Sequence, residues 1–202
     1  MTKVADERLG AFMRFQHDIT ERVMRGSLDP EEVENALRSL IGQRSKKGIL
    51  KLISGAETLM LDALDGKETL ATAKEVFLSG IGHDFENWHT NKAGIATIEQ
   101  AVDVHELIQN ATFAQMFCSL GTDLDKLCLT QAQIKKFCKK HPQWLHQNGY
   151  MTFFLFKVED QFFVARVDVF VGGLRVHINR FKDGHVWFAE FSHRLVVSQL
   201  TA

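Results

Sequence analysis

The sequence predicts an α+β protein in which a helical hairpin precedes a mixed domain that ends in an antiparallel sheet. Two patterns support this prediction. Residues 5–41 place apolar side chains at helical steps of three and four residues. From Tyr150 to Leu200, apolar and polar residues alternate in four short runs separated by turn residues, which is typical of a four-stranded antiparallel meander. We expect a hairpin over residues 1–45 and an α+β domain over 46–202, with its sheet (150–200) covered by helices on one face.

The N-terminal hairpin is predicted to contain two helices. The first covers residues 5–25 and ends at Gly26. In the second, Asp29 is a natural N-cap, Pro30 occupies the first helical position and Gly42 ends the apolar stripe. The basic segment 43–47 then reads as a linker.

The stretch between these helices and the meander carries weaker signals. Residues 58–64 predict a strand, with a helix as the alternative, because periodicity does not separate the two in short apolar runs. The other elements we expect are a helix at 67–77, a loop at 79–94, a strand at 101–107 and a helix at 112–120. Thr130 is a good N-cap for a further helix that stops near His141 and Pro142.

Turn residues also predict the register of the meander. Two-residue turns at Asp183-Gly184 and Gly172-Gly173 give pairings that agree with each other. The pairs are Ile178–Ala189, Val176–Phe191, His177–Glu190, Val169–Val176, Val167–Ile178 and Asp168–His177. This register puts one apolar set on a single face: Val167, Val169, Val176, Ile178, Ala189 and Phe191.

The opposite face of the meander holds the candidate functional residues. They are Arg166, Asp168, Arg175, His177, Glu190 and Arg194. A histidine between two carboxylates keeps a proton near neutral pH, so we expect a raised pKa for His177, and nearby arginines can bind an anion. The alternative is an ordinary set of cross-strand charge pairs that stabilises a solvated face.

Other candidate sites have poor spacing. Metal ligands could come from Cys138, His141 and His146, or from His83, Asp84 and His89. Neither set has the paired spacing of a zinc site, so we predict no metal. The glycines of the 80–94 loop lack the rest of a dinucleotide or phosphate-loop motif, so we predict no cofactor.

Composition narrows the classes of partner. Lys and Arg total 24 against 25 Asp and Glu, which gives no overall field for a nucleic acid. The start lacks the order of a signal peptide, and no apolar run reaches the ~20 residues of a membrane helix. Three cysteines without short spacing suit a reducing compartment, so we expect a cytoplasmic protein without membrane contact.

No stretch of the chain carries a motif that names a reaction. The sequence therefore favours a non-catalytic binding or adaptor module whose N-terminal hairpin docks a protein partner. The alternative is a hydrolase or nuclease-like enzyme that uses the polar face of the meander. Ligand, substrate, reaction and oligomeric state stay open at this level.

Three stretches in the C-terminal half carry a resemblance. Leu127–Gln131, Tyr150–Val158 and His193–Val197 resemble segments of uncharacterised proteins encoded by small-genome bacteria of candidate phyla. The resemblance implies a shared small α+β domain in which the helix begun by Thr130 leads into the meander. It implies no activity and no site residue.

Overall fold

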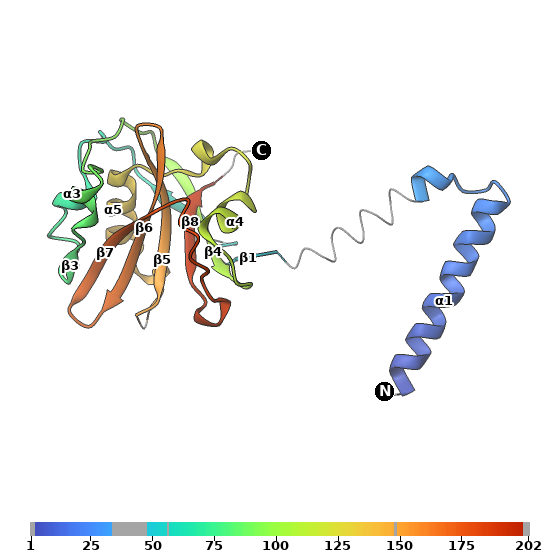
Figure 1. The fold of residues 1–202 in the computed structure, drawn as a ribbon. Helices are drawn as coiled ribbons and strands as arrows, with labels where there is room; N and C mark the ends of the chain where they lie inside the picture. The colour runs from blue at the N-terminus through green and yellow to red at the C-terminus, as the bar shows by residue number, and fades with distance from the viewer. Residues whose placement is uncertain (1–2, 34–47, 56, 148, 200–202) are drawn as a thin grey trace. The chain divides into compact units, whose positions relative to one another are not determined.

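The computed structural model describes residues 3–33, 48–55, 57–147 and 149–199. The chain divides into two units, residues 1–47 and residues 48–202, each described by itself below (Figure 1). Within the described ranges, no helix combines the length and the apolar character needed to cross a membrane.

The N-terminal unit contains the predicted first helix, α1 (Lys3–Met24). It ends at Met24, and Gly26 just beyond it has a φ of +70°, the left-handed conformation that glycine adopts without strain. Asp29 then starts a helical turn, because its carboxylate accepts the N–H of Glu31 at 2.9 Å and its carbonyl accepts that of Val33 at 3.0 Å. The rest of the predicted second helix lies outside the described residues, so the structure shows one complete helix here and no clear hairpin.

Residues 48–202 form an α+β unit around one mixed sheet of eight strands (Figure 1). The strand order is β1-β4-β8-β5-β6-β7-β3, and β2 also pairs with β4. The strands are β1 (Leu50–Leu52), β2 (Leu59–Leu61), β3 (Gly80–Ile81), β4 (Gln100–Leu107), β5 (Met151–Val158), β6 (Gln161–Phe170), β7 (Gly173–Arg180) and β8 (Arg194–Ser198). The β3–β7 and β5–β8 pairs are parallel and the others antiparallel.

The meander has three strands, β5-β6-β7, so the prediction of a fourth is wrong. After β7 the chain leaves the sheet edge and forms an isolated bridge between Trp187 and Ala111, followed by the 3-10 turn η4 (Ala189–Phe191). It re-enters as β8 between β5 and β4. The neighbour of β7 on the side away from β6 is β3. The predicted pairs of β7 with residues 189–191 are therefore absent.

The register between β6 and β7 differs from the predicted one by two residues. Val171 and Gly172 form the turn, so Val167 pairs with Val176, and Asp168 pairs with Arg175 instead of His177. A shift of two residues keeps every side chain on its predicted face, since strand side chains alternate with period two. Val167 and Val176 are accordingly both fully buried.

Both faces of the sheet are covered, so the prediction of one covered face is wrong. Helix α5 (Gln131–Lys140), the short α3 (Asp84–Asn87) and the 3-10 turn η1 (Leu70–Thr72) contribute to the core of one face. Helix α4 (Phe113–Cys118), the 3-10 turn η2 (Leu124–Leu127) and Trp187 contribute to the core of the other. Phe154 and Phe156 of β5 point to the first core, Phe153 and Leu155 to the second. Burial on both sides explains the unbroken apolar run of this central strand.

The helices with strong caps lie where the sequence predicts them. Thr112 and Thr130 each form a capping box, with Gln115 and Gln133 as the reciprocal partners of α4 and α5. The 3-10 turn η3 (Pro142–Trp144) follows α5. Strands β2 and β4 confirm the strands predicted at 58–64 and 101–107. The predicted loop 79–94 instead contains β3 and α3, and β1 is an additional strand.

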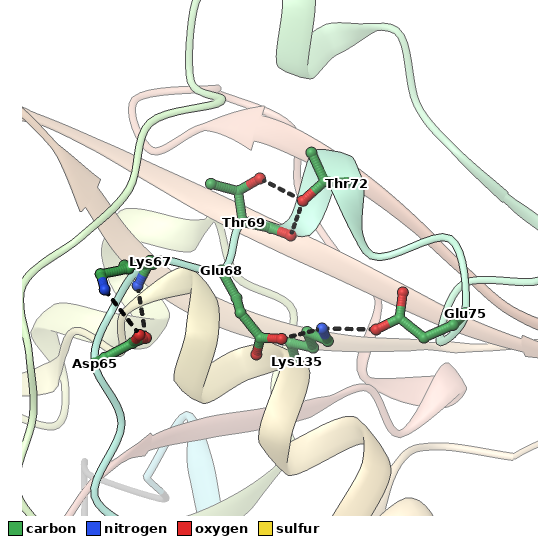
Figure 2. A network of polar contacts seen from close by, with 7 residues as sticks. All are labelled: Asp65, Lys67, Glu68, Thr69, Thr72, Glu75 and Lys135. Atoms are coloured by element: carbon green, nitrogen blue, oxygen red, sulfur yellow. Dashed lines mark hydrogen bonds and ion pairs between the residues drawn. The ribbon is translucent and has the colours of Figure 1, made fainter.

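The helix predicted over residues 67–77 is reduced to η1. The N–H of Leu70 donates to the side chain of Gln131 at 3.0 Å, so a tertiary contact replaces a helical hydrogen bond at this point. Figure 2 shows the polar contacts that join this segment to α5. Lys135 reaches both Glu68 and Glu75 at 2.6 Å.

Lys135 is the buried centre of this network, with 8% of the residue exposed. Burial opposes its charge, but the two carboxylates outweigh burial and raise the pKa of Lys135. The hydrogen bond from Lys135 in turn lowers the pKa of Glu75. A charged lysine thus holds the 68–75 segment against α5.

Candidate functional site

The structure brings four of the six predicted polar-face residues together. Arg166 lies opposite His177, and Asp168 lies opposite Arg175, on neighbouring positions of β6 and β7. Asp168 has no exposed surface, and its Oδ2 accepts from Arg175 Nη2 at 3.0 Å and Nε at 3.3 Å. Oδ2 of Asp168 is thus held in an ion pair within the sheet, whereas Asp168 Oδ1 and Arg166 Nε are buried without a hydrogen-bond partner.

Glu190 and Arg194 do not join this row. Glu190 lies in η4, and β7 has β6 and β3 as its neighbours, so the predicted His177–Glu190 pair is wrong. Arg194 begins β8, where its Nη1 donates to the carbonyls of Trp144 and Leu145 at 3.0 and 3.1 Å. Its role is to satisfy carbonyls at the end of η3.

The environment of His177 reverses the predicted direction of its pKa. Burial and the charges of Arg166 and Arg175 lower this pKa, against smaller opposing effects of Asp168 and Asp84. Asp84 Oδ2 is the nearest carboxylate oxygen, 3.7 Å from His177 Nδ1. The prediction of a raised pKa is therefore wrong: burial disfavours the charged ring, Glu190 is not a neighbour, and Arg166 and Arg175 act against Asp168 and Asp84.

The arginines of this face stack on aromatic rings. The guanidinium carbon of Arg166 lies 5.7 Å from the ring centroid of Trp187, and that of Arg175 lies 4.4 Å from the ring of Phe170. Ion pairing and stacking therefore engage both arginines within the fold. This arrangement suits a network of cross-strand charges that stabilises the sheet.

The first set of candidate metal ligands, Cys138, His141 and His146, makes contacts within the fold. Cys138 is buried in α5, and burial raises the pKa of its thiol. His141 Nε2 lies 3.1 Å from the carbonyl oxygen of Met60, and His146 Nδ1 contacts the carbonyl of Gln147. Across the described ranges, no three side chains of His, Cys, Asp or Glu gather as ligands would.

A cleft of about 630 Å³ lies outside the predicted site. Three segments line it: residues 92–100, residues 125–133 at the start of α5, and residues 157–159 of the β5–β6 hairpin. Its volume falls in the range of ~300–1,000 Å³ typical of ligand sites. We refer to it as the α5 cleft.

Gln131 and Gly66 hold the 92–100 segment in place beside α5. The Gln131 amide donates to the carbonyls of Thr90 and Lys92 at 2.8 and 3.0 Å. Gly66 has a φ of +75°, and a Cβ there would lie 2.1 Å from the carbonyl oxygen of Ile95. Only glycine fits at position 66. The close packing of the 92–100 backbone therefore depends on Gly66 as well as on Gln131.

Two buried polar atoms at the α5 cleft have no hydrogen-bond partner: Gln133 Nε2 and Thr97 Oγ1. Gln133 is 1% exposed, and its Oε1 accepts the Thr130 N–H at 2.9 Å and the Thr130 hydroxyl at 3.2 Å. We call the side that they form with the first turn of α5 the floor of the cleft. Both groups can donate a hydrogen bond, and neither atom is exposed to solvent.

Ion pairs and apolar residues lie around this floor. Lys157 pairs with Asp125 at 2.9 Å, and Lys92 pairs with Glu159. Ile95 lines the cleft and is 77% exposed, and Ile98 on the same segment is 81% exposed.

Cys128 is the candidate nucleophile that the α5 cleft offers. Burial, with the charge of Asp125, raises the pKa of its thiol to about 12. The group therefore stays a protonated thiol at neutral pH, a poor nucleophile.

Sequence reasoning missed this cleft, although parts of it left signals. The Thr130–Gln133 capping box is visible in the sequence, and so are two isoleucines within a polar stretch. Neither signal says that the two segments meet. Comparison of the chain with protein-family models, curated proteins and solved structures gives no match. The resemblance to proteins of small-genome bacteria stays a prediction.

Proposed function

We propose that this protein is a non-catalytic binding module that acts through protein–protein contacts, with the α5 cleft as its principal contact site. The observation that carries the proposal is the lining of the cleft. It combines unpartnered buried donors with apolar surface, and its one thiol is held in the protonated form. These are the parts of a recognition site.

Exposed isoleucines favour a protein partner. Large apolar side chains in the open are informative when they stand beside a concave site. Ile95 and Ile98 fit this description, and buried apolar anchors surrounded by polar groups supply most of the free energy at protein interfaces.

Helix α1 is the second proposed contact. Met13, Phe15 and Met24 are 62%, 60% and 82% exposed. An amphipathic helix with exposed apolar side chains can dock in a groove of a partner. This is the role that the sequence predicts for the N-terminal segment.

The enzymatic alternative depends on the polar face of β6 and β7. Of its two carboxylates, Asp168 is fully buried with Oδ2 in an ion pair, and Glu190 lies in η4 away from His177. That burial weighs against general acid–base chemistry, which needs a group within hydrogen-bond reach of the substrate.

A peptide selection tests the proposal. Random peptides displayed with free C-termini are selected on the full chain, and the winners are mapped by amide chemical-shift changes. We expect shifts at residues 92–100 and 125–133, and at least about a tenfold loss of affinity with Ile95→Asp. Val171→Asp, which changes a fully exposed apolar residue of the β6–β7 turn, should bind as the wild type does.

Three outcomes would overturn the proposal. One is the absence of selected peptides, and another is shifts confined to other surfaces. The third is turnover of a generic ester or phosphodiester that Asp168→Asn abolishes, which would establish the enzyme instead.

A further inference from the structure

We propose that the floor of the α5 cleft binds a carboxylate, namely the C-terminal carboxylate of a partner polypeptide whose last side chain is apolar. This inference rests on the proposed function and names the part of the partner that enters the cleft. The observation behind it is a buried amide donor that lacks an acceptor at the start of a helix.

The orientation of the Gln133 amide follows from its neighbours. Its oxygen accepts the Thr130 N–H, and a flipped amide would put an NH₂ group against that donor. Nε2 must therefore be the group without a partner. A buried donor left unpaired costs free energy, and an acceptor brought by a ligand recovers it.

The start of α5 favours an anion at the same place. The helix has ten residues, so its first turn leaves backbone N–H groups without intrahelical partners. The Thr130 hydroxyl accepts one of them, that of Gln133, at 3.3 Å. The positive end of the helix dipole favours a ligand acceptor that carries negative charge.

Charges at the cleft neither repel nor strongly attract a carboxylate. Lys92 and Lys157 are balanced by Glu159 and Asp125 in ion pairs. Recognition then depends on hydrogen bonds and the helix end, so it should discriminate an acid from an amide while depending weakly on salt.

Apolar residues beside the floor specify the rest of the ligand. Leu129 and Val158 line the cleft together with Ile95. The C-terminal residue of a polypeptide carries its carboxylate next to its side chain. This arrangement matches a cleft in which the donors of the floor adjoin apolar residues. An aspartate or glutamate side chain in mid-peptide lacks this neighbour.

The test compares matched ligands on the full chain. The probes are a hexapeptide ending in leucine, the same peptide with a C-terminal amide, and N-acetyl-leucine. We expect the acid to bind at least about tenfold more tightly than the amide, the ratio expected when a hydrogen bond gains charge assistance. The side-chain NH₂ signal of Gln133 should shift only with the acid.

Gln133→Glu is the informative variant, because glutamate preserves the capping box while replacing the donor with an acceptor. It should remove the preference for the acid. Gln115→Glu makes the same change in the exposed capping box of α4 and should keep that preference. If Gln133→Glu fails to fold, Thr97→Val tests the second unpartnered group and should weaken acid binding.

Each contrary outcome has its own meaning. Equal binding of acid and amide at the cleft would refute the carboxylate inference and leave the proposed function standing. N-acetyl-leucine binding as tightly as the hexapeptide would assign the site to small carboxylic acids and overturn the protein partner. No binding of any probe, together with a failed peptide selection, would overturn both.

Discussion

His193 should make the fold sensitive to acid. The residue precedes β8, is 3% exposed, and has the rings of Phe153 and Trp187 at centroid distances of 5.3 and 5.2 Å. Its Nδ1 accepts the N–H of Met151 at 3.3 Å, which requires the neutral ring. Burial is the main cause that lowers the pKa of His193 to about 4, assisted by the nearby charge of His146.

The size of the effect follows from linkage. An unfolded histidine has a pKa of ~6.5, and the folded value is about 4, so the difference corresponds to about 3 kcal/mol. Above the unfolded value both states are neutral and His193 leaves stability unchanged. Between the two values only the unfolded chain takes up the proton, so stability falls as pH falls. Below the folded value the loss is complete.

Urea unfolding between pH 4 and 8 measures this loss. His193→Phe keeps an aromatic ring but cannot titrate, and it should cost about 1 kcal/mol at pH 7 because the Met151 N–H loses its acceptor. Its free energy of unfolding should fall with acid by about 3 kcal/mol less than that of the wild type. His83→Gln, at an exposed position, should follow the wild-type profile. Parallel profiles for wild type and His193→Phe would refute the reasoning.

Three further predictions concern the fold. Val176→Asp should lower the free energy of unfolding by about 4 kcal/mol, because it buries an unpaired carboxylate, whereas Val171→Asp in the exposed turn should change it by less than about 0.5 kcal/mol. Equal losses would mean that the register is wrong. Lys135→Ala should lower the free energy of unfolding by about 1 kcal/mol in denaturant titrations, a small loss because both carboxylate partners are half exposed. High salt should reduce the difference in stability between Lys135→Ala and Lys139→Ala, and a difference that salt leaves unchanged would contradict this prediction. Deletion of residues 1–47 should leave a soluble domain with a sharp calorimetric transition, and aggregation of that product would show that the first unit belongs to the core.

Elements with local signals were predictable. The Thr130 cap indicates α5 because its hydrogen bonds join residues three positions apart. Alternation along β6 and β7 correctly separates Val167 and Val176 from Asp168 and His177, even though the register is two residues off. Face membership survives an even shift because it depends on parity alone.

Elements that depend on distant partners were predicted wrongly. The 67–77 helix is mostly lost because the Leu70 N–H and the charged side chains of the segment bond to α5. The fourth strand joins β5 and β4, and nothing in its local pattern distinguishes those partners from β7. Backbone donors and acceptors are the same on every strand, so pairing is decided by which edges are free.

The candidate site shows the same division. The sequence alone determined that Arg166, Asp168, Arg175 and His177 share one face, since that follows from chain periodicity. Tertiary structure decided that Asp168 is buried with one oxygen in an ion pair, and that Gln133 and the 92–100 segment line one cleft. Periodicity acts between neighbours in the chain, whereas burial and unpaired donors arise only when segments far apart in sequence pack together.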